Sequence, residues 1–315
     1  MTFDRRRVIQ GGMATAILPW WGAGYAAAAT GTCGLAIGTY GLPNLTVLEA
    51  IKLVAEVGYD AIEITVFPGS SGDPNGALST PEARREIRDA LESSGIRVSA
   101  LMADLKPSES DEKHLEQLKE LRDLVEMAKE LSPENPPLIQ TVLGGKVWEE
   151  SKDLFRDRLA NWNQILADWK GYLAIKPHRG NAMSTPTQAK QLLESLGNPR
   201  RLRMTYDYSH YAFRGEELSV ARTVEEALPV TDYIAVKDAV KKGGKVRFAL
   251  AGSSGTWDPA EMIAAFYRGG YRGDFCCEVS SQIWRNDPDY DPIAATQSCY
   301  SAMAKAFETA QVPRD

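Results

Sequence analysis

Eight short apolar runs recur along the chain, and longer amphipathic segments separate them. The runs are apolar on both faces, as is typical of parallel strands covered on both sides. Segments with a helical period stand between them, for example at 46–58, 80–95 and 112–131. Eight strand–helix repeats predict a (β/α)8 barrel, the TIM barrel fold. The predicted strands lie at 34–40, 61–65, 97–102, 137–144, 172–178, 202–208, 233–239 and 274–280.

Residues that begin and end helices stand at the edges of these amphipathic segments. Thr80 and Thr185 each precede a proline, which is the order of an N-cap residue and a first-turn proline. Gly58 and Gly95 follow helical patterns, at the place of a C-cap glycine. These signals support the alternation of strand and helix.

A doubly wound sheet is the alternative fold for the same alternation. Such a sheet typically carries a glycine-rich phosphate turn after its first strand, and the segment 38–44 is not one. No linker or change of composition divides the chain, so we predict a single-domain barrel over 31–315. The loop at 67–79, rich in Gly, Ser and Pro, is long enough to cover the barrel mouth.

The composition excludes two classes of function. The formal net charge is -6, from 42 acidic and 36 basic residues, which disfavours a nucleic-acid-binding protein. The chain has three histidines, too few for a site that holds several zinc ions. One of them, His114, lies in a charged helical segment, and we expect it on a solvated face.

Residues 1–30 predict a twin-arginine-type signal peptide. The pair Arg5-Arg6 precedes a modest apolar stretch at 13–21, and small residues follow at 26–29, where we expect cleavage. The apolar stretch is shorter than the roughly 20 residues that span a bilayer, so we expect no stable membrane span. The alternative is a basic N-terminus that leads into an ordinary helix. The signal-peptide interpretation predicts export to the periplasm.

Charged side chains stand at the ends of several predicted strands. A (β/α)8 barrel places its catalytic face at the carboxyl ends of the strands, so we expect these side chains to meet there. They are Glu63, Lys176, Asp207, Lys237 and Glu278.

Several segments together resemble the xylose isomerase-like barrels, a group of sugar phosphate isomerases and epimerases. The segment 246–280 is the most telling, because it combines a glycine turn, a helix that opens at Asp258, and a strand that ends on Glu278. The resemblance covers most of the chain after about residue 33. The other segments that carry it are 56–64, 176–197, 204–217 and 233–239.

The resemblance implies a divalent metal held by Glu, Asp, His and Glu from four strands, with proton transfer beside a carbonyl. Asp207 and Glu278 match two of these ligands, and His210 matches a substrate contact. Lys176 stands where the first glutamate is expected, and Ala235 stands where the histidine is expected. This chain therefore departs from the family pattern at two of four ligands.

An ammonium in place of a carboxylate changes the local charge by about two units and repels a divalent cation. We therefore predict no metal cofactor and expect the Lys176 ammonium between Asp207 and Glu278, as a fixed positive charge that stabilises an oxyanion. These three residues are the predicted catalytic group. The alternative is one divalent metal, Mn, Mg or Zn, held by Asp207 and Glu278.

The remaining polar positions predict contacts with a substrate. His178 and His210 follow strand ends and match family positions. Glu63 and Lys237 are predicted to bind substrate, with a structural hydrogen bond or a salt bridge at the barrel rim as the alternative. We expect Glu278, His178, His210 or Glu63 to carry the proton.

Two kinds of function follow from these expectations. The first is an exported isomerase or epimerase, or a related lyase, that acts on a sugar, polyol or keto-sugar. Export favours an unphosphorylated small-molecule carbohydrate. The second is a catalytically inactive barrel that binds a carbohydrate or a partner protein. Barrels of this type are often homo-oligomers, and no sequence feature indicates a symmetry.

Overall fold

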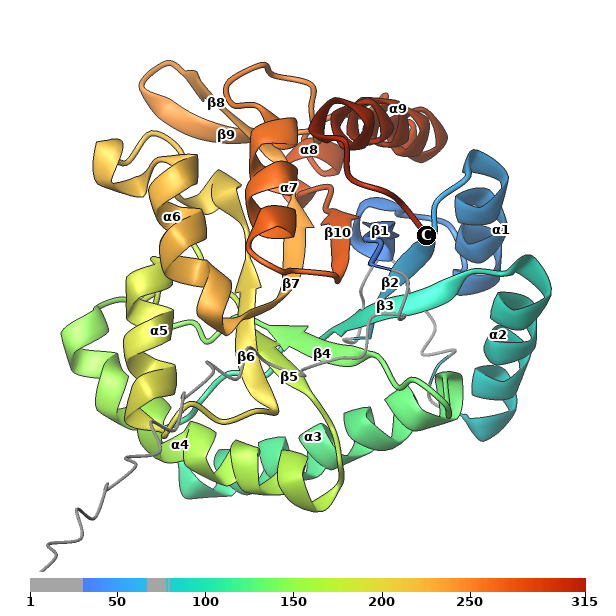
Figure 1. Cartoon of the computed structure of the whole chain (residues 1–315). Coiled ribbons are helices and arrows are strands. Elements are labelled where there is room, and N and C mark those ends of the chain that lie inside the picture. Colours follow the sequence, from blue (N-terminus) through green and yellow to red (C-terminus); the bar gives the residue numbers. More distant parts are fainter. Residues whose placement is uncertain (1–30, 67–77, 79) are drawn as a thin grey trace, which may run out of the picture.

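A closed barrel of eight parallel strands forms the centre of the computed structural model, which describes residues 31–66, 78 and 80–315 (Figure 1). Around the barrel the strand order is β1, β2, β3, β4, β5, β6, β7 and β10, and β10 pairs with β1 to close it. The single-domain TIM barrel is confirmed. The strands are β1 (Gly34–Gly38), β2 (Ala61–Thr65), β3 (Arg97–Met102), β4 (Leu138–Thr141), β5 (Leu173–Ile175), β6 (Leu202–Tyr206), β7 (Thr231–Val236) and β10 (Asp274–Cys277).

Helices surround the barrel and alternate with its strands (Figure 1). Thr80 and Thr185 accept hydrogen bonds from backbone N–H groups of the first turns of α2 and α5, and a proline follows each. Gly58 and Gly95 end α1 and α2 in the left-handed conformation, as predicted. The helices are α1 (Val47–Val57), α2 (Pro81–Ser94), α3 (Asp111–Leu131), α4 (Trp148–Asp168), α5 (Pro186–Ser195), α6 (Val220–Ala227), α7 (Pro259–Arg268), α8 (Ser281–Trp284) and α9 (Pro292–Ala310).

The middle of the barrel is filled largely by small side chains. Alternate residues of a strand share a face, so the residue two positions further along faces the same interior. This spacing places Glu63 above Ala61 and Lys176 above Ala174, toward the carboxyl end. The small side chains leave room for the Tyr233 ring. A polar layer, which includes Glu63, Gln140 and Lys176, lies above them. The interior cluster is Ala36, Ala61, Ala100, Leu138, Ala174, Tyr233 and Cys276.

A two-stranded antiparallel hairpin, β8 (Asp238–Lys242) and β9 (Lys245–Ala249), follows β7 and is absent from the sequence-based prediction. Gly243 and Gly244 form its turn, both with positive φ, which favours glycine. Its strands are mostly exposed or half-buried at the turn end, so they carry no apolar run that would mark them.

Some predicted features are corrected, and others lie outside the described residues. His114 is buried, and its Nε2 lies 2.9 Å from Asn161 Oδ1 on α4, so the expected solvated face is wrong. The signal peptide at 1–30 and, except for Leu78, the loop at 67–79 fall outside the described residues. Within the part of the chain that the structure describes, no helix is long and apolar enough to cross a membrane.

Candidate active site

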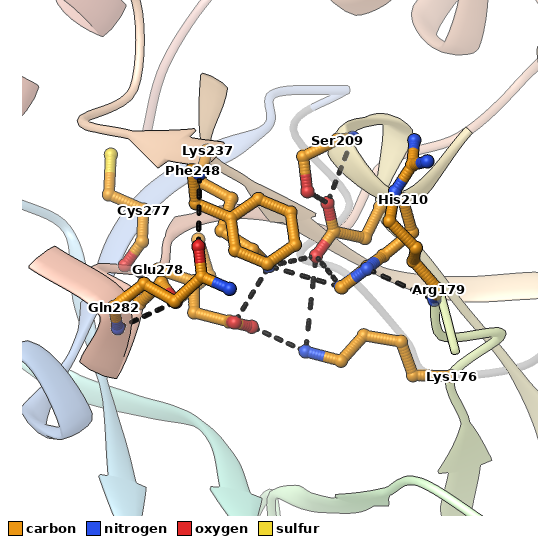
Figure 2. A network of polar contacts seen from close by, with 12 residues as sticks. Lys176, Arg179, Ser209, His210, Lys237, Phe248, Cys277, Glu278 and Gln282 are labelled. Atoms are coloured by element: carbon orange, nitrogen blue, oxygen red, sulfur yellow. Dashed lines mark hydrogen bonds and ion pairs between the residues drawn. The ribbon is translucent and has the colours of Figure 1, made fainter. Parts of the chain in front are cut away.

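Four strand ends bring two lysines and two acids together at the carboxyl end of the barrel. Lys176 follows β5, Asp207 follows β6, Lys237 follows β7 and Glu278 follows β10. Their exposed fractions are 4%, 0%, 1% and 8%, so the charges lie inside the protein. Figure 2 shows the side chains of Lys176, Lys237 and Glu278 converging from different strands. We call these four residues the lysine–carboxylate cluster.

Lys237 joins the two acids through two of its three N–H groups. Its Nζ donates to Asp207 Oδ2, donates to Glu278 Oε1 at 2.7 Å, and lies 3.4 Å from His210 Nε2. The ring of Phe248 covers the same ammonium, with its centroid 5.1 Å from Nζ. Because the Nδ1 of neutral His210 accepts from Arg179, its Nε2 carries the proton and faces Asp207, so the hydrogen bonds of Lys237 are those to the two acids, which it holds together.

Lys176 is bonded differently. Its Nζ donates to Glu278 Oε2 and lies 4.0 Å from Asp207 Oδ2. Among the described residues it has no second hydrogen bond, so donor capacity remains on this ammonium. The expected position beside both carboxylates is found, but the hydrogen bonds that join the two carboxylates come from Lys237.

The buried charges neutralise one another. Burial favours the neutral form of Asp207, but the Lys237 ammonium outweighs it and holds the pKa of Asp207 well below its ordinary value. Burial also favours neutral Glu278, yet Lys176 and Lys237 lower the pKa of Glu278 to about 2. Burial opposes the charge on Lys176, but Glu278 and Asp207 raise the pKa of this lysine. Ser209 completes the shell, donating to Asp207 Oδ1 from its backbone N at 3.1 Å and from its hydroxyl at 2.6 Å.

Two neutral histidines lie beside the cluster. The rings of His178 and His210 are 4.0 Å apart between centroids. Burial, together with the neighbouring His210 ring, lowers the pKa of His178 to about 3. Burial lowers the pKa of His210 to about 4 although Asp207 lies 3.3 Å from its Nε2. His210 Nδ1 accepts from the backbone N of Arg179 at 3.2 Å, whereas the buried Nδ1 of His178 has no partner in the described residues.

Glu63 lies in the polar layer with Gln140, which sequence reasoning missed. The Gln140 amide donates to Glu63 Oε2, while Glu63 Oε1 is buried without a partner in the described residues. Burial raises the pKa of Glu63 to about 7 despite the positive charge of Lys176. Gln140 stands inside the predicted strand 137–144, where nothing in the sequence separates a polar lining residue from an ordinary strand residue.

Phe248, from the unpredicted hairpin, covers the cluster. Its ring meets the His210 ring edge-on with centroids 5.1 Å apart (Figure 2). Its backbone N donates to Gln282 Oε1 at 3.4 Å, which ties the hairpin to the segment after β10. The signal that would have located this cover is the Gly243-Gly244 turn.

The donor set does not fit a divalent cation. The oxygens of Asp207 and Glu278 that face the centre already accept hydrogen bonds from ammonium groups. Ala235, 2% exposed, lies two residues before Lys237 and offers no donor. Across the described residues, no three His, Cys, Asp or Glu side chains are grouped so as to hold a metal ion.

The fold and site define a (β/α)8 barrel with an ionic cluster at its carboxyl end, the face on which such barrels carry out chemistry. A family model described as xylose isomerase-like TIM barrel matches residues 51–298. The chain belongs to this family. No curated protein matches it in sequence.

Solved structures share this fold at low sequence identity. A xylose isomerase domain protein from Alicyclobacillus acidocaldarius has a TM-score of 0.69 and 14% identity, covering 89% of this chain and 99% of its own. The IOLI protein with a bound zinc atom has a TM-score of 0.68 and 17% identity, covering 87% and 97%. The E. coli 3-keto-D-glucoside 4-epimerase YcjR has a TM-score of 0.63 and 15% identity, covering 88% and 99%. Such identities establish the fold alone.

Proposed function

We propose that this barrel is an exported isomerase or epimerase that moves a proton on the carbon beside a carbonyl of an unphosphorylated sugar or keto-sugar. The observation that carries the proposal is the Lys176 ammonium, buried beside Glu278 with donor capacity to spare. Family membership and neighbours such as the 3-keto-D-glucoside 4-epimerase support the class of reaction. Export rests on the arginine pair and small-residue run of residues 1–30.

In this proposal the lysines take the place of a family metal site that has degraded. Lys176 replaces an expected glutamate ligand and Ala235 an expected histidine. A metal polarises a carbonyl by placing positive charge on its oxygen, and a buried ammonium places a hydrogen-bonded positive charge at the same kind of atom. No step in the proposal passes through a metal.

The bonding of the two lysines assigns them different roles. Lys237 donates to both acids, so it holds Asp207 and Glu278 in position. Lys176 donates to the substrate carbonyl oxygen, which becomes the enolate oxygen when the proton leaves the neighbouring carbon. When Lys176 donates to that oxygen, its interaction with Glu278 weakens. The pKa of Glu278 then rises, and the carboxylate becomes a better base. Glu278 then takes the proton. In an isomerisation it returns the proton to the adjacent carbon while the hydroxyl proton moves to the former carbonyl oxygen, and in an epimerisation a second acid, for which Glu63 is the candidate, delivers a proton to the opposite face of the same carbon.

Glu63 and the histidines complete the proposed site. A carboxyl with a pKa of about 7 can exist in both protonation states near neutrality, which suits Glu63 to relay a proton. His178 and His210 are neutral, so they offer hydrogen bonds to sugar hydroxyls without adding charge.

A catalytically inactive carbohydrate-binding barrel is the second candidate. The observation that favours it is the engagement of both Glu278 oxygens by ammonium groups, which weakens this carboxylate as a base. In that case the cluster is a structural network beneath a binding site, or beneath a surface that takes a partner protein.

Deuterium exchange separates the two candidates. We expect the full chain to incorporate solvent deuterium into at least one of a panel of keto-sugars in D2O, as measured by proton NMR. Glu278→Gln should abolish the exchange, whereas Glu225→Gln, an exposed change on α6, should leave it intact. Saturable sugar binding without exchange would support the binding protein instead. Stoichiometric, tightly held Mn²⁺, Mg²⁺ or Zn²⁺ in metal analysis of the purified protein would refute the replacement of the metal by lysine.

A further inference from the structure

Two arginines beside the candidate active site have no acidic partner. Arg179 lies on the connection between β5 and α5, and Arg214 on the connection between β6 and α6. Neither forms an ion pair with a carboxylate of the described residues. The Arg179 Nη2 donates to the Ala212 carbonyl, and Arg214 donates to the Ser184 carbonyl at 2.6 Å and to its hydroxyl at 3.3 Å.

Some other partly buried arginines of this protein are matched with acids, whereas Arg122, Arg201 and Arg272 form no ion pair within the described residues. Arg97 pairs with Asp274, and Arg203 with Asp232 at 3.2 Å. Arg314 pairs with Asp60 at 2.9 Å. The chain has more acidic than basic residues, 42 against 36, so acids are not scarce. Arg201 and Arg272 lie over the rings of Tyr172 and Tyr267, whereas Arg179 and Arg214 have neither an acidic partner nor a ring partner within the described residues.

The two guanidinium groups lie close enough to influence each other. Burial and the nearby Arg214 charge lower the pKa of Arg179. The Arg179 Nε is buried and has no hydrogen-bond partner among the described residues. The Arg179 guanidinium also bonds to the carbonyl of Ala212, two residues before Arg214, so the two like charges share one region of the surface. Such a pair is a favourable place for an oxyanion, which guanidinium groups bind through paired N–H groups.

An exposed aromatic residue stands next to these arginines. Phe213, immediately before Arg214, is 46% exposed. Its φ is 63°, a left-handed conformation that is unusual for a bulky residue. The loop thus holds an apolar ring at the surface in a strained backbone conformation, and such strain concentrates at ligand-binding sites.

The segment that carries Arg179 is joined to the lysine–carboxylate cluster through His210. Arg179 directly follows His178, and its backbone N donates to His210 Nδ1 at 3.2 Å (Figure 2). The opposite nitrogen of His210 lies 3.3 Å from Asp207 Oδ2. The segment that carries Arg179 therefore contacts one of the histidines proposed to bind the reacting sugar.

We propose that Arg179, Arg214 and Phe213 form a subsite for the anionic group of an acidic sugar. The guanidinium groups bind its carboxylate or phosphate, and the Phe213 ring lies against the C–H face of the sugar ring. This inference rests on the proposed function, since it names the substrate class of the same mouth. The carboxylate of a uronate and the phosphate of a sugar phosphate share the required chemistry. The proposed unphosphorylated substrate favours the carboxylate, and the experiment distinguishes the two.

The test is calorimetric titration of the full chain with D-glucuronate, D-galacturonate, the neutral sugars D-glucose and D-galactose, and D-glucose 6-phosphate. We expect an acidic sugar to bind about tenfold more tightly than its neutral counterpart, the effect of one charge-assisted contact. The advantage should shrink in high salt, because exposed charges are screened. A uronate that binds more tightly than the sugar phosphate identifies the carboxylate as the anion, and the reverse order identifies the phosphate.

Single variants locate the subsite. Arg179→Gln and Arg214→Gln should each reduce the preference for the acidic sugar about tenfold, while both keep an amide donor for the loop carbonyls. Arg268→Gln, an exposed arginine in the last turn of α7, is the matched control and should retain the preference. Equal binding of acidic and neutral sugars, or equal effects of all three variants, would overturn the subsite.

The two proposals fail separately. Deuterium exchange into neutral keto-sugars without any preference for acidic sugars would disprove the subsite and leave the isomerase proposal standing. Arginine-dependent binding of acidic sugars without exchange into any sugar would support the subsite and favour the inactive binding protein.

Discussion

Replacing Lys237 by methionine tests whether the lysine–carboxylate cluster holds the barrel mouth together. The substitution keeps a similar side-chain length and removes an ammonium that contacts Asp207, Glu278 and His210. Lys237 is 1% exposed and Asp207 is 0% exposed, so water cannot replace the lost contacts without rearrangement. The variant therefore leaves buried carboxylates only partly compensated by Lys176.

The expected loss follows from the cost of an unpaired buried charge. Removing one partner of a buried ion pair costs about 3–5 kcal/mol. The ammonium of Lys176 remains 4.0 Å from Asp207 Oδ2 and partly compensates its charge. We therefore expect Lys237→Met to lower the free energy of unfolding by about 3 kcal/mol at pH 7. The surface pair Lys190–Glu226, with 3.3 Å between Nζ and Oε1 and both side chains about one-third exposed, supplies the control. Lys190→Met should cost less than about 1 kcal/mol.

Urea unfolding followed by circular dichroism measures both variants. The pKa values of Asp207 and Glu278 are lowered in the folded protein, so their stabilisation is present above the ordinary carboxyl pKa and is lost as pH falls below it. The difference in free energy of unfolding between wild type and Lys237→Met should therefore shrink as pH falls from 7 toward 3.

A second substitution isolates the interaction. Lys237→Met combined with Asp207→Asn removes the uncompensated charge, so the double variant should be more stable than the sum of the two single losses predicts. A loss below about 1 kcal/mol for Lys237→Met, or strict additivity in the double variant, would refute our account of the cluster.

Two further predictions concern the same layer of the barrel. The pKa of Glu63 is raised to about 7, so the folded state holds this proton more tightly than the unfolded state. As pH rises from 4.5 to above 7, the free energy of unfolding of wild type should fall by about 3 kcal/mol relative to that of Glu63→Gln. Urea unfolding of both proteins at pH 4.5, 6 and 8 measures this, and a difference that does not change with pH would contradict it. The double variant Lys176→Glu with Ala235→His restores both ligands that the family resemblance implies. It should bind Mn²⁺ in calorimetric titration, whereas wild type should not. A folded double variant that does not bind Mn²⁺ would count against descent from a metal site.

The barrel was predictable because its signals are local. The predicted strands at 61–65 and 97–102 coincide with β2 and β3, and the N-cap residues Thr80 and Thr185 begin helices as expected. Apolar runs and capping residues act within a few neighbours along the chain, so they can be recognised without knowledge of the fold. The predicted strand at 137–144 was too long, since β4 ends at Thr141 and the chain then leaves the barrel wall.

The hairpin over the site escaped prediction for a related reason. Strands β8 and β9 are partly exposed and carry charged residues, so they have neither the apolar run of a buried strand nor the period of a helix. Phe248 was therefore missed as a cover for the cluster, and the glycine pair of the turn was the one local signal. His114 shows the opposite error, because its charged helix concealed a buried contact with Asn161.

The sequence by itself determined that charged residues stand at the ends of strands and that Lys176 and Ala235 occupy positions where the family resemblance implies metal ligands. Only the tertiary structure decided how these charges are shared, because barrel closure brings Lys176 and Glu278, 102 residues apart, into contact. Lys237 donates to both acids, whereas Lys176 donates to Glu278 alone, a distinction that no spacing in the chain encodes. The physical reason is that a strand end specifies a side chain, whereas its partners and the cost of its burial depend on all the strands that meet there.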